Sequence, residues 1–182
     1  DTHMKLGHFR IPPADVVVHA GDLLQRDSAP PLPVLRLLAS LSAAAGARHV
    51  VCVGGNHDGA LERMGAAAVR EVLPLYLEND GAEALGLRFH GCPWSRLTSS
   101  ANSAFQRTER DARAWLDAVP DALDVLVSHD GHHPVWDPVR ERASPRLHVC
   151  GHIHFKHGVD AVGGTLRVTS CVCDDNRAPR QL

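Results

Sequence analysis

Four short runs of β-branched and other apolar residues each end at a cluster of glycine and polar residues. They cover residues 15–20, 49–53, 123–127 and 146–150. Continuous apolar runs of this length, bounded by turn residues, are typical of strands that are buried on both faces. We therefore predict four buried strands, each leading into a polar loop.

Between and around these runs, apolar residues recur at the three- and four-residue spacing of an amphipathic helix. This spacing predicts helices over 34–45, 61–73 and 104–119, and glycine and proline signals interrupt the second near Gly65 and stop it at Pro74. Shorter alternating segments predict hairpin strands over 75–78, 82–85 and 87–90. The alternation over 165–172 predicts a last sheet strand.

Strands that alternate with helices indicate an α/β layered domain, and we expect residues 1–182 to form a single one. The four buried strands lead directly into polar clusters: Gly21-Asp22, Gly55–Asp58, Ser128-His129 and Gly151–His154. Open α/β sheets hold their ligands outside the carboxyl ends of the strands. We therefore expect these clusters to meet in one site.

Length, charge and composition narrow the class of protein. The chain has 182 residues, a formal net charge of −2 and 44% hydrophobic residues. A charge so close to zero argues against nucleic acid or an acidic membrane surface as the main partner. No apolar stretch approaches the ~18 residues that a membrane-spanning helix needs. The charge and the hydropathy thus argue against nucleic acid and a membrane as partners, and they leave protein partners open.

Histidine and cysteine are the two residue types whose use is informative. The five cysteines form no paired framework, which favours reduced thiols and a cytoplasmic location. The 13 histidines are numerous for a chain with only 4% aromatic residues. An excess of histidine is compatible with a tag, a pH sensor or a metal site, so the placement of these residues has to decide.

The polar clusters, together with Asp1 and His3, supply carboxylate, imidazole and amide donors, which suit divalent transition metals. One ion takes about four to six ligands, whereas these clusters offer seven or more. Two ions that share a bridging carboxylate would use them all. Taken singly, each residue has a simpler interpretation: an Asp after a strand forms turns, a His satisfies a local hydrogen bond, and Gly-Asn-His makes a turn. Five clusters, four of them placed at strand ends, favour the metal site.

In chain order the clusters read D-x-H, G-D, G-N-H-[DE], H and G-H-x-H, and they run from Asp1 to His154. This ordered set resembles that of the calcineurin-like metallophosphoesterases. Residues 89–94, 145–149 and 169–172 also resemble the metallophosphoesterase-domain-containing group, which is associated with cyclic nucleotide phosphodiesterase activity. The resemblance implies a four-layer α/β/β/α sandwich.

The resemblance also implies two sets of metal ligands that share Asp22. One set is Asp1, His3, Asp22 and His154; the other is Asp22, Asn56, His129 and His152. His57 would face the substrate and give a proton to the leaving oxygen, and Asp58 would orient His57. Manganese is the expected metal, with iron or zinc as the alternatives.

The implied reaction is hydrolysis of a small phosphodiester, such as a cyclic nucleotide, by attack of a metal-bridging hydroxide. A phosphomonoesterase of the same superfamily is one alternative. A nuclease is another, disfavoured because no basic stripe accompanies the site. A non-catalytic metal-binding protein built around the same residues is the alternative of a different class.

Four residues are candidates for contact with the substrate: Asn56, His57, Arg26 and Trp94. The guanidinium of Arg26 matches the geometry of phosphate oxygens, although a solvated surface arginine is the simpler interpretation. The Trp94 indole could stack on a nucleobase, and a packing role is the alternative.

The resemblance further implies a buried strand directly before the D-x-H aspartate. The printed chain begins at that residue, Asp1, and ends at Leu182. We therefore expect a sandwich that lacks its first and last strands.

Overall fold

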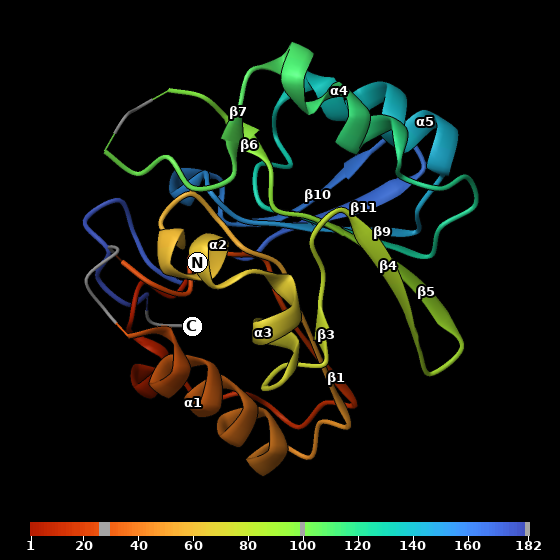
Figure 1. The fold of residues 1–182 in the computed structure, drawn as a ribbon. Coiled ribbons are helices and arrows are strands. Elements are labelled where there is room, and N and C mark those ends of the chain that lie inside the picture. The colour runs from red at the N-terminus through yellow and green to blue at the C-terminus, as the bar shows by residue number, and fades with distance from the viewer. Residues whose placement is uncertain (26–29, 99–100, 181–182) are drawn as a thin grey trace.

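The computed structural model describes residues 1–25, 30–98 and 101–180, and its two main sheets pack face to face (Figure 1). The first sheet is parallel, with the order β1 (Val16–His19), β2 (His49–Cys52) and β3 (Leu75–Tyr76). The predicted strands over 15–20 and 49–53 are therefore confirmed.

The second sheet has six strands in the order β10-β11-β9-β8-β5-β4. Its four inner strands are mutually parallel, whereas β4 and β10 run antiparallel at the two edges. The strands are β4 (Asp80–Ala84), β5 (Leu87–Cys92), β8 (Val125–Ser128), β9 (Leu147–Cys150), β10 (Gly158–Val162) and β11 (Thr165–Thr169).

Helices cover the outer face of each sheet (Figure 1). The first sheet carries α1 (Pro31–Ala44), α2 (Gly59–Met64) and α3 (Ala66–Arg70), and the second carries α4 (Glu109–Asp117) and α5 (Asp137–Ala143). Gly65, at φ 79°, separates α2 from α3, as the sequence predicts. Short pieces complete the fold: the 3₁₀ turns η1 (Leu6–His8), η2 (Pro134–Trp136) and η3 (His154–Lys156), and the paired strands β6 (Ser95–Arg96) and β7 (Gln106–Arg107).

Three separate apolar cores correspond to the three interfaces between these four layers. One packs α1 to α3 on the first sheet, around residues such as Leu35 and Tyr76. A second lies between the sheets and joins Val51 of β2 to Val127 of β8. The third packs α4 and α5 on the second sheet, around Trp136. The four-layer α/β/β/α arrangement is therefore confirmed.

Two sequence predictions in the middle of the chain are wrong. The segment over 75–78 is not a hairpin strand, because β3 pairs parallel with β2 in the first sheet. The helix predicted over 104–119 begins only at Glu109, because Gln106–Arg107 pairs with β6 and the Thr108 side chain accepts a hydrogen bond from the Asp111 amide as the helix cap.

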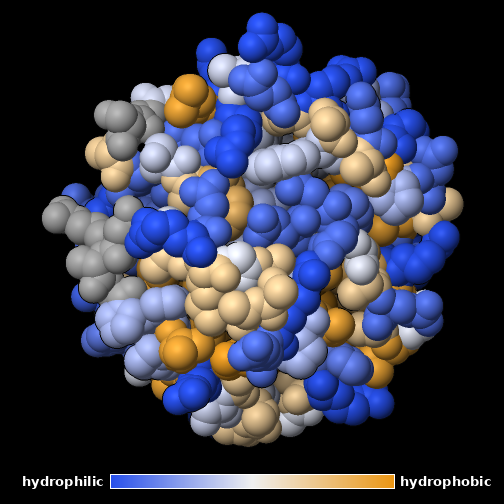
Figure 2. Space-filling model, viewed as in Figure 1, coloured by the Kyte–Doolittle hydropathy of each residue, from blue (hydrophilic) through white to orange (hydrophobic). Residues whose placement is uncertain are grey.

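Two further observations concern the polarity of the surface and the length of the helices. Polar and charged side chains cover most of the face in Figure 2, and apolar residues lie there in small groups. Within the described ranges, none of the helices has the length and apolar character needed to cross a membrane.

Candidate metal centre

The polar clusters lie in the loops that follow β1, β2, β8 and β9, at the carboxyl ends of strands from both sheets. The backbone ties these loops together across large sequence separations. The Asp1 carboxylate accepts from the His152 amide at 2.8 Å, and the Asp22 carboxylate accepts from the His57 amide at 2.8 Å. Side chains from distant parts of the chain are thus held at one place.

The first predicted ligand set is assembled. The Nε2 atoms of His3 and His154 are 3.2 Å apart, and His154 Nε2 lies 3.2 Å from Asp1 Oδ2. His3 Nε2 lies 3.8 Å from Asp22 Oδ2. These distances link the four side chains in a row, from Asp1 through His154 and His3 to Asp22.

The second predicted set lies beside the first. Asn56 Oδ1 is 3.0 Å from His129 Nε2 and 2.9 Å from His152 Nδ1. His129 Nε2 is also 3.4 Å from Asp22 Oδ1. Asp22 thus turns one oxygen to each set, which is the arrangement that a shared ligand requires.

Hydrogen bonds on the far side of two rings fix which nitrogen carries the proton. His129 Nδ1 lies 2.9 Å from the Ala20 carbonyl, and His154 Nδ1 lies 2.7 Å from the Asp174 carbonyl. A carbonyl oxygen only accepts, so both Nδ1 atoms carry hydrogen and, in a neutral ring, both Nε2 atoms present lone pairs. These lone pairs face the oxygens of Asn56 and Asp1.

Acceptors that face acceptors at this distance repel each other unless a cation lies between them. Ligands bound at ~2.0–2.2 Å from one ion are separated by about 3.0–3.5 Å from each other, which agrees with the spacings found. Asp1 Oδ1 is in addition buried without a hydrogen-bond partner among the described residues. The donor set therefore fits divalent metal ions, with the outer carbonyl bonds orienting the rings.

Three of the seven proposed ligands have a left-handed backbone: His3 (φ 41°), Asp22 (φ 54°) and His152 (φ 66°). Such conformations cost about 1–3 kcal/mol each and are retained where the surrounding structure enforces them, often at functional sites. Gly151 provides the space beside them, because a Cβ atom there would lie 2.1 Å from Asp1 Oδ1. The loops are thus shaped around the ligand atoms.

Burial favours the neutral form of two imidazoles of the centre, His3 and His152. It lowers the pKa of His3 to about 3 and that of His152 to about 4. Burial alone would raise the pKa of the Asp22 carboxyl, but His129, His57 and His3 outweigh it and hold that pKa below its usual range. Neutral imidazole and ionised carboxylate are the forms that bind a metal ion.

His57 lies beside the shared carboxylate of Asp22, and Gln25, not the expected Asp58, contacts its ring. Its Nδ1 donates to the Gln25 carbonyl at 2.9 Å, and its Nε2 lies 3.9 Å from Asp22 Oδ2. The ring is therefore positioned by Gln25, with Nε2 turned toward the ligand cluster.

The expected orienting role of Asp58 is corrected by its contacts. The Asp58 carboxylate accepts backbone hydrogen bonds, at 2.7 to 3.3 Å, from the amides of Leu23, Leu24 and Gly55. Burial, together with the negative charge of Asp22, raises the Asp58 pKa to about 7. Asp58 thus fixes the loop after β1 against the turn after β2. It affects the metal centre only by positioning Asp22 and Asn56, which these two segments carry.

The two other candidate substrate contacts have different outcomes. Trp94 is fully buried in the third core, and its indole N–H donates to the Arg107 carbonyl at 3.1 Å. No face of its ring is open to a nucleobase, so the packing interpretation holds. Arg26 lies outside the described residues.

Sequence reasoning missed residues that reach the centre from the C-terminal segment. Arg177 and Phe155 line the same cavity as Asn56 and His57, and the Cys171 thiol lies beside Asp1 and His154. Phe155 directly follows the G-H-x-H motif, which could have drawn attention to it. Nothing in the sequence around Arg177 indicates its position, because the C-terminal segment must first fold back across the strand ends.

The comparisons with known proteins agree with this geometry. The family model described as "Calcineurin-like phosphoesterase" matches residues 2–156. UPF0046 protein C25E10.12 of Caenorhabditis elegans is 28% identical, over 96% of this chain and 73% of that protein. Human metallophosphoesterase domain-containing protein 1 is 25% identical, over 98% of this chain and 66% of that protein.

The chain thus spans about two thirds to three quarters of these relatives. Among solved structures, TT1561 of Thermus thermophilus superposes with a TM-score of 0.63 over 86% of this chain and 76% of its own, at 16% identity, which supports the fold. The family match covers all the clusters after Asp1. The chain belongs to the calcineurin-like phosphoesterases, a family of metal-dependent phosphoester hydrolases.

Proposed function

We propose that this protein hydrolyses a small phosphodiester with the help of two divalent metal ions. The observation that carries the proposal is the division of seven ligand side chains into two groups that share Asp22, with lone pairs directed inward. One ion would be held by Asp1, His3, Asp22 and His154. The other would be held by Asp22, Asn56, His129 and His152.

Bound divalent ions supply a more acidic water and neutralise the charge of a phosphate ester. The residues of the chain do the remaining work. Buried carbonyl contacts hold the His129 and His154 rings in the tautomer that leaves Nε2 available. The amide of His57 holds the Asp22 carboxylate in place.

His57 is the proposed proton donor to the leaving oxygen. Gln25 occupies its Nδ1, so a second proton can reside only on Nε2, the nitrogen turned toward the centre. Asp22 Oδ2 lies 3.9 Å from this nitrogen. General acids of this kind contribute about 10²- to 10⁴-fold to the rate.

A small ester is the preferred substrate class, and a cyclic nucleotide is the specific candidate, supported by the resemblance of residues 89–94, 145–149 and 169–172 to the metallophosphoesterase-domain-containing group. The cavity over the ligands measures about 200 Å³. The net charge of −2 supports a small substrate over a nucleic acid. Manganese is the proposed metal, with iron and zinc as alternatives, and the cytoplasm is the proposed location.

Hydrolysis of bis(p-nitrophenyl) phosphate and p-nitrophenyl phosphate by the Mn²⁺-loaded protein tests the proposal. We expect turnover of the diester to exceed that of the monoester, with two metal equivalents bound by mass spectrometric metal analysis. Faster cleavage of the monoester would instead favour a phosphatase. Two bound equivalents without turnover of either ester would favour a non-catalytic metal-binding protein.

A further inference from the structure

A cavity of about 200 Å³ opens directly over the metal ligands. Metal-centre residues form one side of it, and residues without a role in that centre form the other. The second side consists of Ile153, Phe155, Asp175 and Arg177. A substrate whose phosphate reaches the ligands must therefore contact this second side.

Arg177 is the only lysine or arginine among the described residues that line the cavity. Its Nη2 lies 3.4 Å from Nε2 of His57, the proposed proton donor. It forms no ion pair with a carboxylate in the described part of the chain, although Asp175 lines the same cavity. A guanidinium without a counter-ion, pointed at an anion-processing centre, suits a phosphate oxygen.

The turn that carries Arg177 is anchored to a metal ligand. The Asp174 side chain accepts from the amides of Asn176 and Ala178, at 2.9 and 2.8 Å. The Asp174 carbonyl accepts from His154 Nδ1 at 2.7 Å. The backbone of this turn is therefore fixed relative to the ligand cluster.

Phe155 forms the apolar part of the same rim. It directly follows the ligand His154 in η3, and 73% of it is exposed, the largest fraction among the large hydrophobic side chains in the described ranges. Exposing a phenyl ring to water is unfavourable, whereas a planar base offers it a stacking partner. Stacking against an aromatic ring is tolerant of the identity of the base.

We infer that Arg177 and Phe155 form a nucleotide-binding edge, in which Arg177 holds a non-bridging phosphate oxygen and Phe155 stacks on the attached base. The inference rests on the proposed function, since it places the phosphate over the metal ligands. It narrows the substrate class to phosphoesters that carry a planar base.

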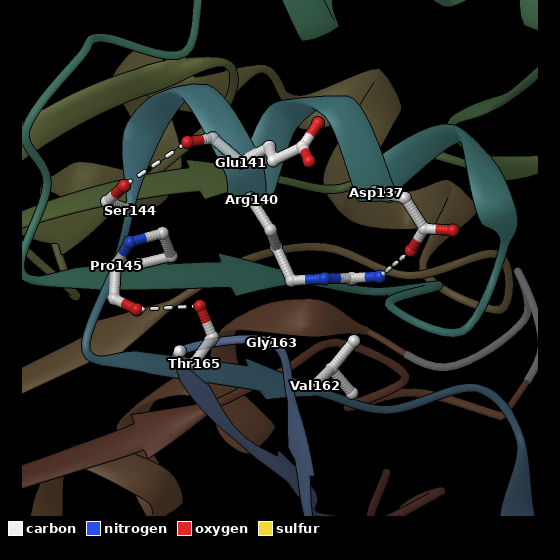
Figure 3. A pocket seen from close by; sticks show the side chains of 9 residues that line it. Asp137, Arg140, Glu141, Ser144, Pro145, Val162, Gly163 and Thr165 are labelled. Carbon is white, nitrogen blue, oxygen red and sulfur yellow. Dashed lines mark hydrogen bonds and ion pairs between the residues drawn. The ribbon is translucent and has the colours of Figure 1, made fainter.

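A larger cavity beside α5 does not compete for this role. It measures about 400 Å³ and lies between the end of α5 and the turn after β10, lined by residues such as Glu141 and Gly163 (Figure 3). Its arginine, Arg140, already pairs with Asp137, which the dashed line in Figure 3 marks. The charge is thus satisfied within the protein.

Equilibrium binding to the Mn²⁺-loaded protein, measured by calorimetry, tests the inference without relying on turnover. The ligands are 5′-AMP, ribose 5-phosphate and inorganic phosphate. The variants are Arg177→Ala, Arg177→Lys, Phe155→Leu and Phe155→Trp. Arg113→Ala, which removes a 70% exposed arginine side chain of α4, is the matched control. Metal content and circular dichroism verify that each variant keeps its centre and fold.

For the wild type we expect 5′-AMP to bind about tenfold more tightly than ribose 5-phosphate, since stacking on an aromatic ring contributes about 1–3 kcal/mol per base. Phe155→Leu should remove this difference and Phe155→Trp should keep it. Arg177→Ala should weaken all three ligands about tenfold, with partial recovery in Arg177→Lys.

Unchanged affinities in Arg177→Ala, or a base preference that survives Phe155→Leu, would overturn the inference. So would a wild type that binds 5′-AMP no better than phosphate. Ester turnover without these binding effects would contradict this edge but leave the proposed function intact. Binding effects without turnover would support the edge and contradict the proposed reaction.

Discussion

Buried histidines gather in two regions of the second sheet, and their hydrogen bonds differ in kind. At the metal centre, the lone pair of His129 Nε2 faces the Asn56 oxygen at 3.0 Å. One strand away, His148 Nε2 lies 2.7 Å from Ser128 Oγ, and an Arg140 Nη1 donor lies 3.3 Å from its Nδ1. Every ring nitrogen of His148 thus has a complementary partner, whereas the Nε2 lone pair of His129 faces another acceptor.

The comparison shows that burial of a histidine does not by itself indicate a metal site. His129 and His148 are both 0% exposed. What separates them is whether the protein satisfies the ring or leaves a lone pair directed at further lone pairs. The first arrangement is a structural network that is complete without a ligand, and the second is completed by a cation.

The substitution Asp22→Asn, which replaces the shared carboxylate, should have the largest effect on the metal centre. We expect hydrolysis of bis(p-nitrophenyl) phosphate to fall at least about a thousandfold, beyond the ~10- to 100-fold typical of an outer-shell partner. The metal content should fall below two equivalents, because both sets lose an anionic ligand. His148→Ala is the matched control, and it should keep two equivalents.

Metal removal should affect the two regions unequally. Chelation of the wild type should lower the free energy of unfolding by about 4 kcal/mol if the metal had been present at about 1,000 times its dissociation constant. Urea denaturation with and without chelator measures the change. His148→Ala should show the same dependence on metal, and Asp22→Asn a smaller one. Equal chelator effects in Asp22→Asn and the wild type would contradict the assignment.

His57→Ala separates proton donation from metal binding within the centre. We expect turnover to fall about a hundredfold while two metal equivalents remain bound, because His57 lies beside the ligands without belonging to either set. Loss of metal together with activity would instead make His57 a ligand. Single-turnover kinetics and metal analysis on the same sample give the answer.

Removing His148 from its hydrogen bonds with Ser128 and Arg140 should lower the stability of the protein without lowering its activity. His148→Ala leaves the buried Ser128 Oγ without its partner and removes one acceptor from Arg140, which keeps its ion pair with Asp137. An unsatisfied buried polar group costs about 1–3 kcal/mol, and we expect that loss in the free energy of unfolding of the metal-loaded protein. Activity per folded molecule should stay within about twofold of the wild type.

The smallest predicted effect is a pH dependence of stability. Burial, reinforced by the charge of Arg140, holds the pKa of His148 well below its usual value. The folded state therefore binds fewer protons than the unfolded state below the unfolded pKa of about 6.5. The contribution of His148 is fully present above that pH and is lost as the pH falls below it, with a slope of at most ~1.4 kcal/mol per pH unit.

Urea denaturation between pH 7 and pH 5 measures this slope. His148→Gln, which cannot titrate, should show a slope smaller by up to the same ~1.4 kcal/mol per pH unit. Equal slopes in the two proteins would mean that His148 binds as many protons in the folded state as in the unfolded state.

Much of the fold follows from local pattern, and the errors have local causes. The runs over 49–53 and 123–127 are strands because continuous β-branched stretches suit burial on both faces. The pairing of 75–76 is mispredicted because its partner, β2, lies far away in sequence. The short strand at 106–107 replaces the start of the predicted helix because it pairs with β6, and local helix spacing does not reveal that pairing.

The residue types of the ligands, their order and their positions after strands follow from the sequence, because each buried apolar run leads directly into a polar cluster. Which atoms come into contact depends on the tertiary structure. It directs the two oxygens of Asp22 to different ligand sets and sets the ring tautomers through the Ala20 and Asp174 carbonyls. It also brings Arg177 to His57. These contacts join residues up to 120 positions apart. Local patterns predict elements, whereas the direction of a lone pair depends on the packing of all four layers.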